Sequence, residues 1–204
     1  MTTNTLTRLE GYRASRGKEA EAQEIFKDWA KHYGFKVEEI RGYEANRTQG
    51  DWKMNGNNIE VKSQNIGKYR VNFFELGEVT DKEYHADGWD KLIEVMANYG
   101  VDLTGEEAYE MFNFGFTPVV NGATVFYINR ETELIYVYSA QRLLKLVAEG
   151  IGANGMHRGR GKANKDTIST FIRNSQTTFQ KINGEWVYTG LPNEQTVLKA
   201  LGAK

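Results

Sequence analysis

The feature that most constrains the fold is a hairpin pattern in the first third of the chain. Residues 51–54 and 58–64 alternate apolar and polar side chains, and the turn Asn55-Gly56-Asn57 separates them. Alternation with a period of two is typical of strands, and an Asn-Gly pair between two such runs favours a tight antiparallel turn. The sequence therefore predicts a β-hairpin, with Asp51 at the head of its first strand.

Helices and further strands are predicted on both sides of this hairpin. An amphipathic helix over Lys18–Tyr33 ends at Gly34 and is followed by a strand over Phe35–Ile40. The middle of the chain predicts helical pieces at Trp89–Tyr99 and Gly105–Met111, a hairpin of Thr124–Asn129 with Leu134–Tyr138, and a helix over Ala140–Glu149. A glycine-rich basic loop follows. The last part predicts a short helix over Thr167–Ile172, a hairpin of Thr178–Ile182 with Trp186–Thr189, and a final helix from Asn193 to Leu201. This order predicts an α/β fold in which helices flank a mixed central sheet.

Composition excludes several classes of protein. The 204 residues contain no cysteine, which excludes disulfide scaffolds, thiolate zinc sites, iron–sulfur clusters and thiol nucleophiles. The N-terminus lacks the apolar core of a signal peptide, and no apolar run is long enough to span a bilayer. We therefore expect a cytoplasmic protein with no membrane partner, folded as a single domain over residues 1–204.

Charge is unevenly distributed, although the formal net charge is only −1. Acidic residues dominate Glu75–Glu110, whereas basic residues dominate Arg142–Lys181. A basic, glycine-rich stretch suits a polyanion, because glycine permits close backbone approach and Arg and Lys neutralise phosphates. We interpret the chain as three parts. The core comprises residues 16–71 and 122–150, and an acidic segment of residues 72–121 is inserted into it. Residues 151–204 form a C-terminal basic loop and a hairpin.

The hairpin also carries the chemistry. Strand alternation places Glu60, Lys62 and Gln64 on one face, opposite the apolar Ile59 and Val61. The carboxylate of Asp51 is then expected to approach that of Glu60 across the hairpin. Two carboxylates suit Mg²⁺, which takes the rest of its coordination shell from water and substrate phosphate. A neighbouring lysine would orient or deprotonate a metal-bound water and neutralise charge on a phosphate.

These residues resemble the PD-(D/E)XK superfamily of restriction-endonuclease-like nucleases, which includes archaeal-type Holliday junction resolvases and many type II restriction enzymes. The resemblance rests on Asp51 followed by Glu60-Val61-Lys62, after a helix and the strand start Gly34-Phe35-Lys36-Val37. It covers Arg16–Gln64 and extends to Thr124–Glu149. It implies a restriction-endonuclease-like core, Mg²⁺ held by Asp51 and Glu60 with Mn²⁺ as a substitute, Lys62 assisting the attacking water, and phosphodiester hydrolysis that leaves a 5′-phosphate.

The sequence departs from this pattern at two places. Gly50 stands where the family usually has proline. Many members also carry a metal-facing Glu on the first helix, and here Glu19, Glu21 and Glu24 are the candidates. Helical spacing favours Glu19, which lies on the face of Ala22 and Phe26; the alternative for all three is a solvated helix start, where acids favour the helix dipole.

Gln64 follows Lys62 by two residues, which resembles a variant of the family motif. In that variant the glutamine would hydrogen-bond the scissile phosphate or its neighbour. The alternative is an ordinary exposed strand glutamine.

The resemblance implies a Mg²⁺-dependent DNA endonuclease, and a type II restriction-like enzyme acting on duplex DNA is our first expectation. The alternatives are a structure-specific nuclease of the resolvase, phage or repair kind, an RNA nuclease, and a non-catalytic DNA-binding module with the same fold. We expect a homodimer if both strands are cut. The residues expected to contact the DNA backbone are Lys68, Arg70, Arg158, Arg160, Lys162 and Lys165.

Overall fold

The computed structural model describes the backbone of most of the chain. The described residues are 3–42, 45, 48–63, 70–76, 86–103, 117–151, 156–160, 166–171, 175 and 177–203. Only the backbone is described for residues 3–16, 70–76, 86–89, 91–92, 117, 147, 149–151, 156–160 and 166–171. No helix in these ranges is both long and apolar enough to cross a membrane.

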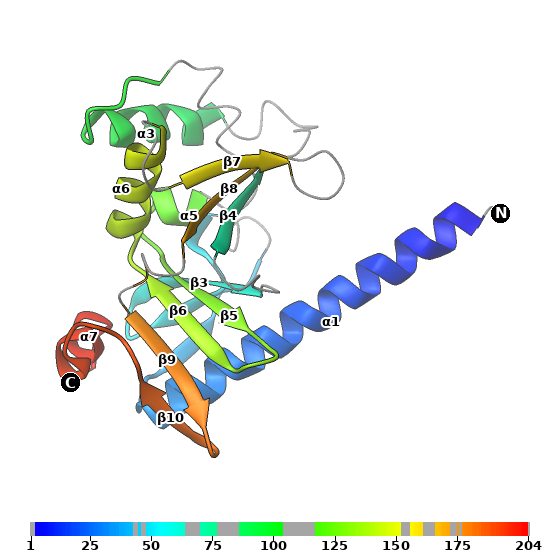
Figure 1. Ribbon diagram of the computed structural model, residues 1–204, viewed down its shortest axis with the longest axis vertical. Coiled ribbons are helices and arrows are strands. Elements are labelled where there is room, and N and C mark those ends of the chain that lie inside the picture. The colour runs from blue at the N-terminus through cyan, green and yellow to red at the C-terminus, as the bar shows by residue number, and fades with distance from the viewer. Residues whose placement is uncertain are drawn as a thin grey trace.

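The first helix, α1 (Thr3–His32), is longer than the sequence pattern predicts. Its C-terminal half buries Ala22, Phe26 and Trp29 against the sheet, which confirms the predicted apolar face. Its N-terminal half projects away from the rest of the protein (Figure 1). The predicted polar stretch before Lys18 is therefore helical, because the absence of proline lets the helix continue past the point where apolar periodicity stops.

A seven-stranded sheet forms the centre of the molecule. Its strands, in spatial order, are β1 (Val37–Glu39), β2 (Trp52–Met54), β3 (Asn57–Ser63), β5 (Thr124–Asn129), β6 (Leu134–Tyr138), β9 (Thr177–Ile182) and β10 (Glu185–Tyr188). All neighbouring pairs are antiparallel except β3 with β5, which run parallel. The sheet is therefore mixed, and the predicted α/β class is confirmed at this level.

Helices cover both faces of the sheet. One core packs α1 and α7 (Glu194–Ala200) against residues such as Ile59, Phe126 and Phe179. The other core packs α3 (Ala86–Ala97), α5 (Thr117–Val120) and α6 (Ala140–Ile151) against Val125 and Tyr127. Because successive strand residues point to opposite faces, β5 contributes to both cores. The central strands are thus buried on both sides.

A second, three-stranded sheet differs from the sequence expectation. It contains β4 (Arg70–Leu76), β8 (Asp166–Phe171) and β7 (Met156–Arg160), with β8 in the middle. The short helix predicted over Thr167–Ile172 is wrong, because its β-branched residues pair with strands on both sides. The basic loop predicted from Met156 is likewise wrong over Met156–Arg160, which is a strand. β4, which spans the start of the predicted acidic insertion, pairs with β8 in this sheet.

Several other local predictions are confirmed. Asn183 and Gly184 have positive φ angles of 53° and 88°, which suit the tight turn between β9 and β10. Asn193 caps α7 by accepting hydrogen bonds from the backbone N–H groups of Gln195 and Thr196. The predicted helix at Trp89–Tyr99 corresponds to α3, whereas the predicted helical piece at Gly105–Met111 lies outside the described residues.

Candidate active site

Strand pairing brings Asp51 close to Glu60. Trp52 in β2 pairs with Ile59 in β3, so Asp51 and Glu60 each lie next to a paired residue. The backbone N–H of Asp51 also donates to the Ile59 carbonyl at 2.8 Å. The predicted hairpin is therefore confirmed.

The Asp51 carboxylate is held by the backbone of the neighbouring strand. The Val61 N–H donates to Asp51 Oδ2 at 2.8 Å. Val61 lies between Glu60 and Lys62, so the hydrogen bond ties the carboxylate to the segment that carries the other two residues. The position of Asp51 is thus set by main-chain geometry and not only by side-chain packing.

Gly50 explains why proline is absent from this motif. Its φ angle is +101°, whereas the proline ring fixes φ near −65°. A Cβ atom at Gly50 would lie 2.5 Å from the Ile59 carbonyl oxygen and 3.2 Å from Glu60 Oε2. The chain therefore uses glycine to bring its backbone against β3 directly beside the Glu60 carboxylate.

Glu60 is a buried carboxylate. Its side chain is 7% exposed, and its Oε1 accepts a hydrogen bond from Lys62 Nζ. Burial is the main cause that raises the pKa of Glu60 to about 7; the charges of Asp51 and Glu19 also raise it, against the opposing effect of Lys62. The attraction of Lys62 therefore offsets only part of the cost of burying the Glu60 charge.

Lys62 lies beside Glu60 and is partly open to solvent, with 36% of its side chain exposed. Burial alone would lower its pKa, but Glu60, through its charge and its hydrogen bond, together with Asp51 and Glu19, raises the pKa of Lys62 above its ordinary value. Lys62 is thus an ammonium at neutral pH in this arrangement. An ammonium suits orienting a water and neutralising phosphate charge, and it does not suit removing a proton.

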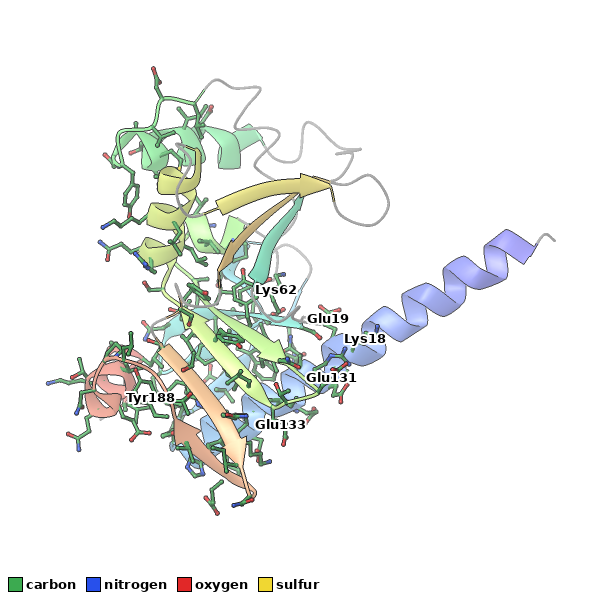
Figure 2. The ribbon with its side chains drawn as sticks, in the orientation of Figure 1. Lys18, Glu19, Lys62, Glu131, Glu133 and Tyr188 are labelled. Carbon is green, nitrogen blue, oxygen red and sulfur yellow. The ribbon has the colours of Figure 1, made fainter. Side chains whose placement is uncertain are left out.

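The three candidate glutamates on α1 differ in their contacts. Glu21 pairs with Arg130 at 2.7 Å, and Glu24 pairs with Lys27. Glu19 is exposed on α1, and its charge acts on both Glu60 and Lys62. Figure 2 shows Glu19 and Lys62 in the same region, where α1 passes the end of β3. Of the candidates on this helix, Glu19 is the one that the fold brings to the site.

The charge balance of this corner fits a divalent cation. Among the described side chains, Asp51, Glu60 and Glu19 oppose the ammonium of Lys62. Carboxylate oxygens are the ligands that Mg²⁺ prefers, and one or two of them are enough when substrate phosphate completes the shell. Within the described ranges, no three acidic or histidine side chains converge closely enough to form a metal-binding group. Asp51 and Glu60 are therefore the two carboxylates considered for an ion.

The expected DNA contacts are only partly described. Arg70 begins β4, and Arg158 and Arg160 lie on β7, all in the second sheet. Their backbones are placed, whereas their side chains are outside the description. Gln64, Lys68, Lys162 and Lys165 lie outside the described residues.

Tyr127 belongs to the site and was not singled out by the sequence. The parallel pairing of β3 with β5 puts Tyr127 beside Lys62 on the same face. Tyr127 is 2% exposed, and burial is the main cause that raises its pKa, with Tyr138 and Glu60 adding to it. The alternation of β5 assigns Tyr127 to a face, but only the long-range register shows that this face is the one of Glu60 and Lys62.

The chain was also compared with known proteins. No protein-family model, no curated protein and no solved structure matches it.

Proposed function

We propose that this chain is a Mg²⁺-dependent DNA endonuclease that hydrolyses phosphodiester bonds, built on a restriction-endonuclease-like core. The observation that carries the proposal is the convergence of Asp51, Glu60 and Lys62 at one corner of the sheet. The order of elements supports it, because α1 precedes an antiparallel β1–β2–β3 meander whose last strand pairs in parallel with β5. This is the arrangement expected of the family that the motif resembles.

The proposed mechanism assigns a separate role to each of these residues. Asp51 and Glu60 would hold Mg²⁺, or Mn²⁺ in its place, and the bound ion would neutralise the scissile phosphate and make water more acidic. Lys62 would orient the attacking water through its ammonium group and balance the charge that develops on the phosphate. The backbone N–H of Val61 would keep Asp51 in place throughout.

The proposed substrate is DNA, with a type II restriction-like action on duplex as the first candidate. The second sheet begins soon after the site strand β3 and carries Arg70 in β4 and Arg158 and Arg160 in β7. Basic residues at this place would bind the phosphate backbone without reading bases. A homodimer would follow if the enzyme cuts both strands at a symmetric site.

The test is cleavage of supercoiled plasmid, linear duplex and a synthetic four-way junction, each in Mg²⁺ and in EDTA. The key variant is Lys62→Ala, and Lys53→Ala, an exposed lysine on β2 of the same hairpin, is the matched control. Discrete fragments that disappear with EDTA and with Lys62→Ala support a restriction-like enzyme. Selective cutting of the junction under the same controls supports a structure-specific nuclease.

Two results would overturn the catalytic proposal. One is cleavage of equal rate in the Lys62→Ala variant, which would mean that a contaminating nuclease acts. The other is DNA binding without cleavage in Mg²⁺ or Mn²⁺, which would assign the fold to a non-catalytic DNA-binding module.

A further inference from the structure

A cavity lies away from the Asp51, Glu60 and Lys62 corner. Its volume is about 300 Å³, and it is lined by residues at the start of β5, the end of β6, the starts of α6 and β9, and α7. None of the three residues of the candidate active site is among those that line it. It is therefore a feature that the proposed nuclease chemistry does not use.

The cavity contains a cation with a buried nitrogen that lacks a partner. Arg142 lines it, and Arg142 Nε is buried and has no hydrogen-bond partner within the described part of the chain. No acidic residue is among the described residues of the lining. A buried guanidinium nitrogen without an acceptor is costly, so this arrangement favours an anionic ligand.

Hydroxyl groups also line the cavity. Thr124, Ser139 and Thr177 line it together with Tyr138. Burial raises the pKa of Tyr138, so its hydroxyl keeps its proton. Ser139 precedes α6 and caps it, because its Oγ accepts from the Arg142 N–H at 3.2 Å, and the positive end of the helix dipole adds to the charge of Arg142. Together with Arg142, these hydroxyl groups offer more hydrogen-bond donors than a carboxylate with two oxygens needs.

Apolar side chains line the cavity as well. Pro192, Val197 and Leu201 from the α7 region and Val137 from β6 line it. A ligand that fills the cavity thus needs an anionic group for Arg142 and a body that packs on carbon. A volume of about 300 Å³ lies at the lower end of the range for small-molecule sites.

We propose that this cavity binds a small organic phosphate monoester of the size of a mononucleotide, with its phosphate on Arg142 and its organic body against Val197 and Leu201. The site is independent of the proposed nuclease activity. Binding requires neither metal nor DNA, so failure of one proposal leaves the other standing.

The experiment is isothermal titration calorimetry in EDTA with deoxyadenosine 5′-monophosphate as the probe. Deoxyadenosine, inorganic phosphate and benzoate are titrated in parallel. The variants are Arg142→Gln, which removes the cation, and Ala200→Phe, which fills the cavity from an exposed position on α7. Lys145→Gln, an exposed change on the same helix that alters the net charge equally, is the control.

We expect the monophosphate to bind at least tenfold more tightly than deoxyadenosine, phosphate or benzoate. Arg142→Gln and Ala200→Phe should each weaken this binding at least tenfold, whereas Lys145→Gln should change it less than twofold. Unchanged thermal midpoints of the variants show that the fold is intact. If Arg142→Gln does not fold, the affinity of Ala200→Phe tests the proposal alone. The proposal is overturned by unchanged affinity in Ala200→Phe, by phosphate or nucleoside binding as tightly as the monophosphate, by tighter binding of benzoate, or by no binding at all.

Discussion

The Asp51 carboxylate accepts a hydrogen bond from the Val61 N–H at 2.8 Å. The residue that connects Glu60 to Lys62 through the backbone therefore also fixes the second acid of the candidate site. One strand thus sets the positions of all three groups. Substitutions at Asp51 can therefore separate its effect on stability from its effect on activity.

Asp51→Asn and Asp51→Ala should differ in stability and agree in activity. Asparagine keeps a carbonyl acceptor for the Val61 N–H, so its free energy of unfolding should lie within about 1 kcal/mol of wild type. Alanine leaves that N–H without its acceptor and should cost about 1–3 kcal/mol. Both should abolish Mg²⁺-dependent cleavage. Urea denaturation and plasmid nicking measure the two effects, and an active Asp51→Asn variant would contradict the proposed metal role.

Glu60 should make stability fall as pH rises. Its folded-state pKa of about 7 lies above the ordinary value of 4.5, so its contribution to stability is present below pH 4.5 and is lost as pH rises through 7. In EDTA, the free energy of unfolding of wild type should fall by on the order of 3 kcal/mol over this pH range. That of Glu60→Gln should not show this fall. Glu38→Gln, a change at an exposed acid on β1, is the control and should follow wild type. Parallel pH profiles for wild type and Glu60→Gln would contradict the prediction.

Divalent cation should reverse that loss. Mg²⁺ binds the ionised carboxylates of Asp51 and Glu60, so it should raise the thermal midpoint of wild type more at pH 8 than at pH 5.5. Asp51→Asn and Glu60→Gln should show no such rise. Differential scanning fluorimetry over a Mg²⁺ series measures it, with equal ionic strength maintained by NaCl. A rise of the same size in both variants would place the ion elsewhere.

Gly50→Ala should be more harmful than Gly42→Ala. Both glycines have φ near +100°, but a Cβ at Gly42 meets nothing within 4 Å, whereas at Gly50 it would lie 2.5 Å from the Ile59 carbonyl oxygen. The backbone strain common to both is about 1–3 kcal/mol, and the clash adds to it at Gly50 alone. Chemical denaturation should show Gly50→Ala as clearly the less stable variant, with lost cleavage. Equal losses would mean that the close approach to β3 is relaxed in solution.

Asp28 should stabilise the C-terminal hairpin in a manner that depends on pH. Its Oδ2 accepts hydrogen bonds from Lys181 Nζ at 2.8 Å and Trp186 Nε1 at 2.9 Å. These contacts, with Lys181 the largest, lower the pKa of Asp28 below 3.8. Its contribution is thus present above pH 3.8 and lost as pH falls through the folded-state pKa. Acid titration followed by Trp fluorescence should show a shallower loss of stability in Asp28→Asn than in wild type.

The sequence predicts the elements whose determinants are local. The turns at Asn55-Gly56-Asn57 and Asn183-Gly184 fix their hairpins within a few residues, and Asn193 caps its helix in the same way. The second sheet could not be predicted, because β4 and β8 are far apart in the chain and each gains its partner only in the fold. Without that pairing, Thr167–Ile172 carries no pattern that separates a strand from a short helix.

The proximity of the candidate site residues was predictable from the sequence, but their environment was not. Helical spacing favoured Glu19, and the structure brings its charge to Glu60. The burial of Glu60 was not predictable, since the strand pattern is that of a hairpin with one open polar face. In the fold, α1 and α5 pack on opposite sides of β3, and β5 lies alongside it. The raised pKa of Glu60 therefore originates from residues remote in sequence.

The parallel pairing of β3 with β5 has a consequence for biosynthesis. During translation, Glu60 and Lys62 leave the ribosome long before their partners Val125 and Tyr127, because residues 64–123 come between the two strands. Until then β3 has only β2 beside it, and its other edge offers unpaired backbone groups to any neighbouring chain. Parallel contacts over such a separation also form slowly. The nascent protein therefore acquires its candidate active site late, and the half-made sheet is the stage at which a chaperone would be needed.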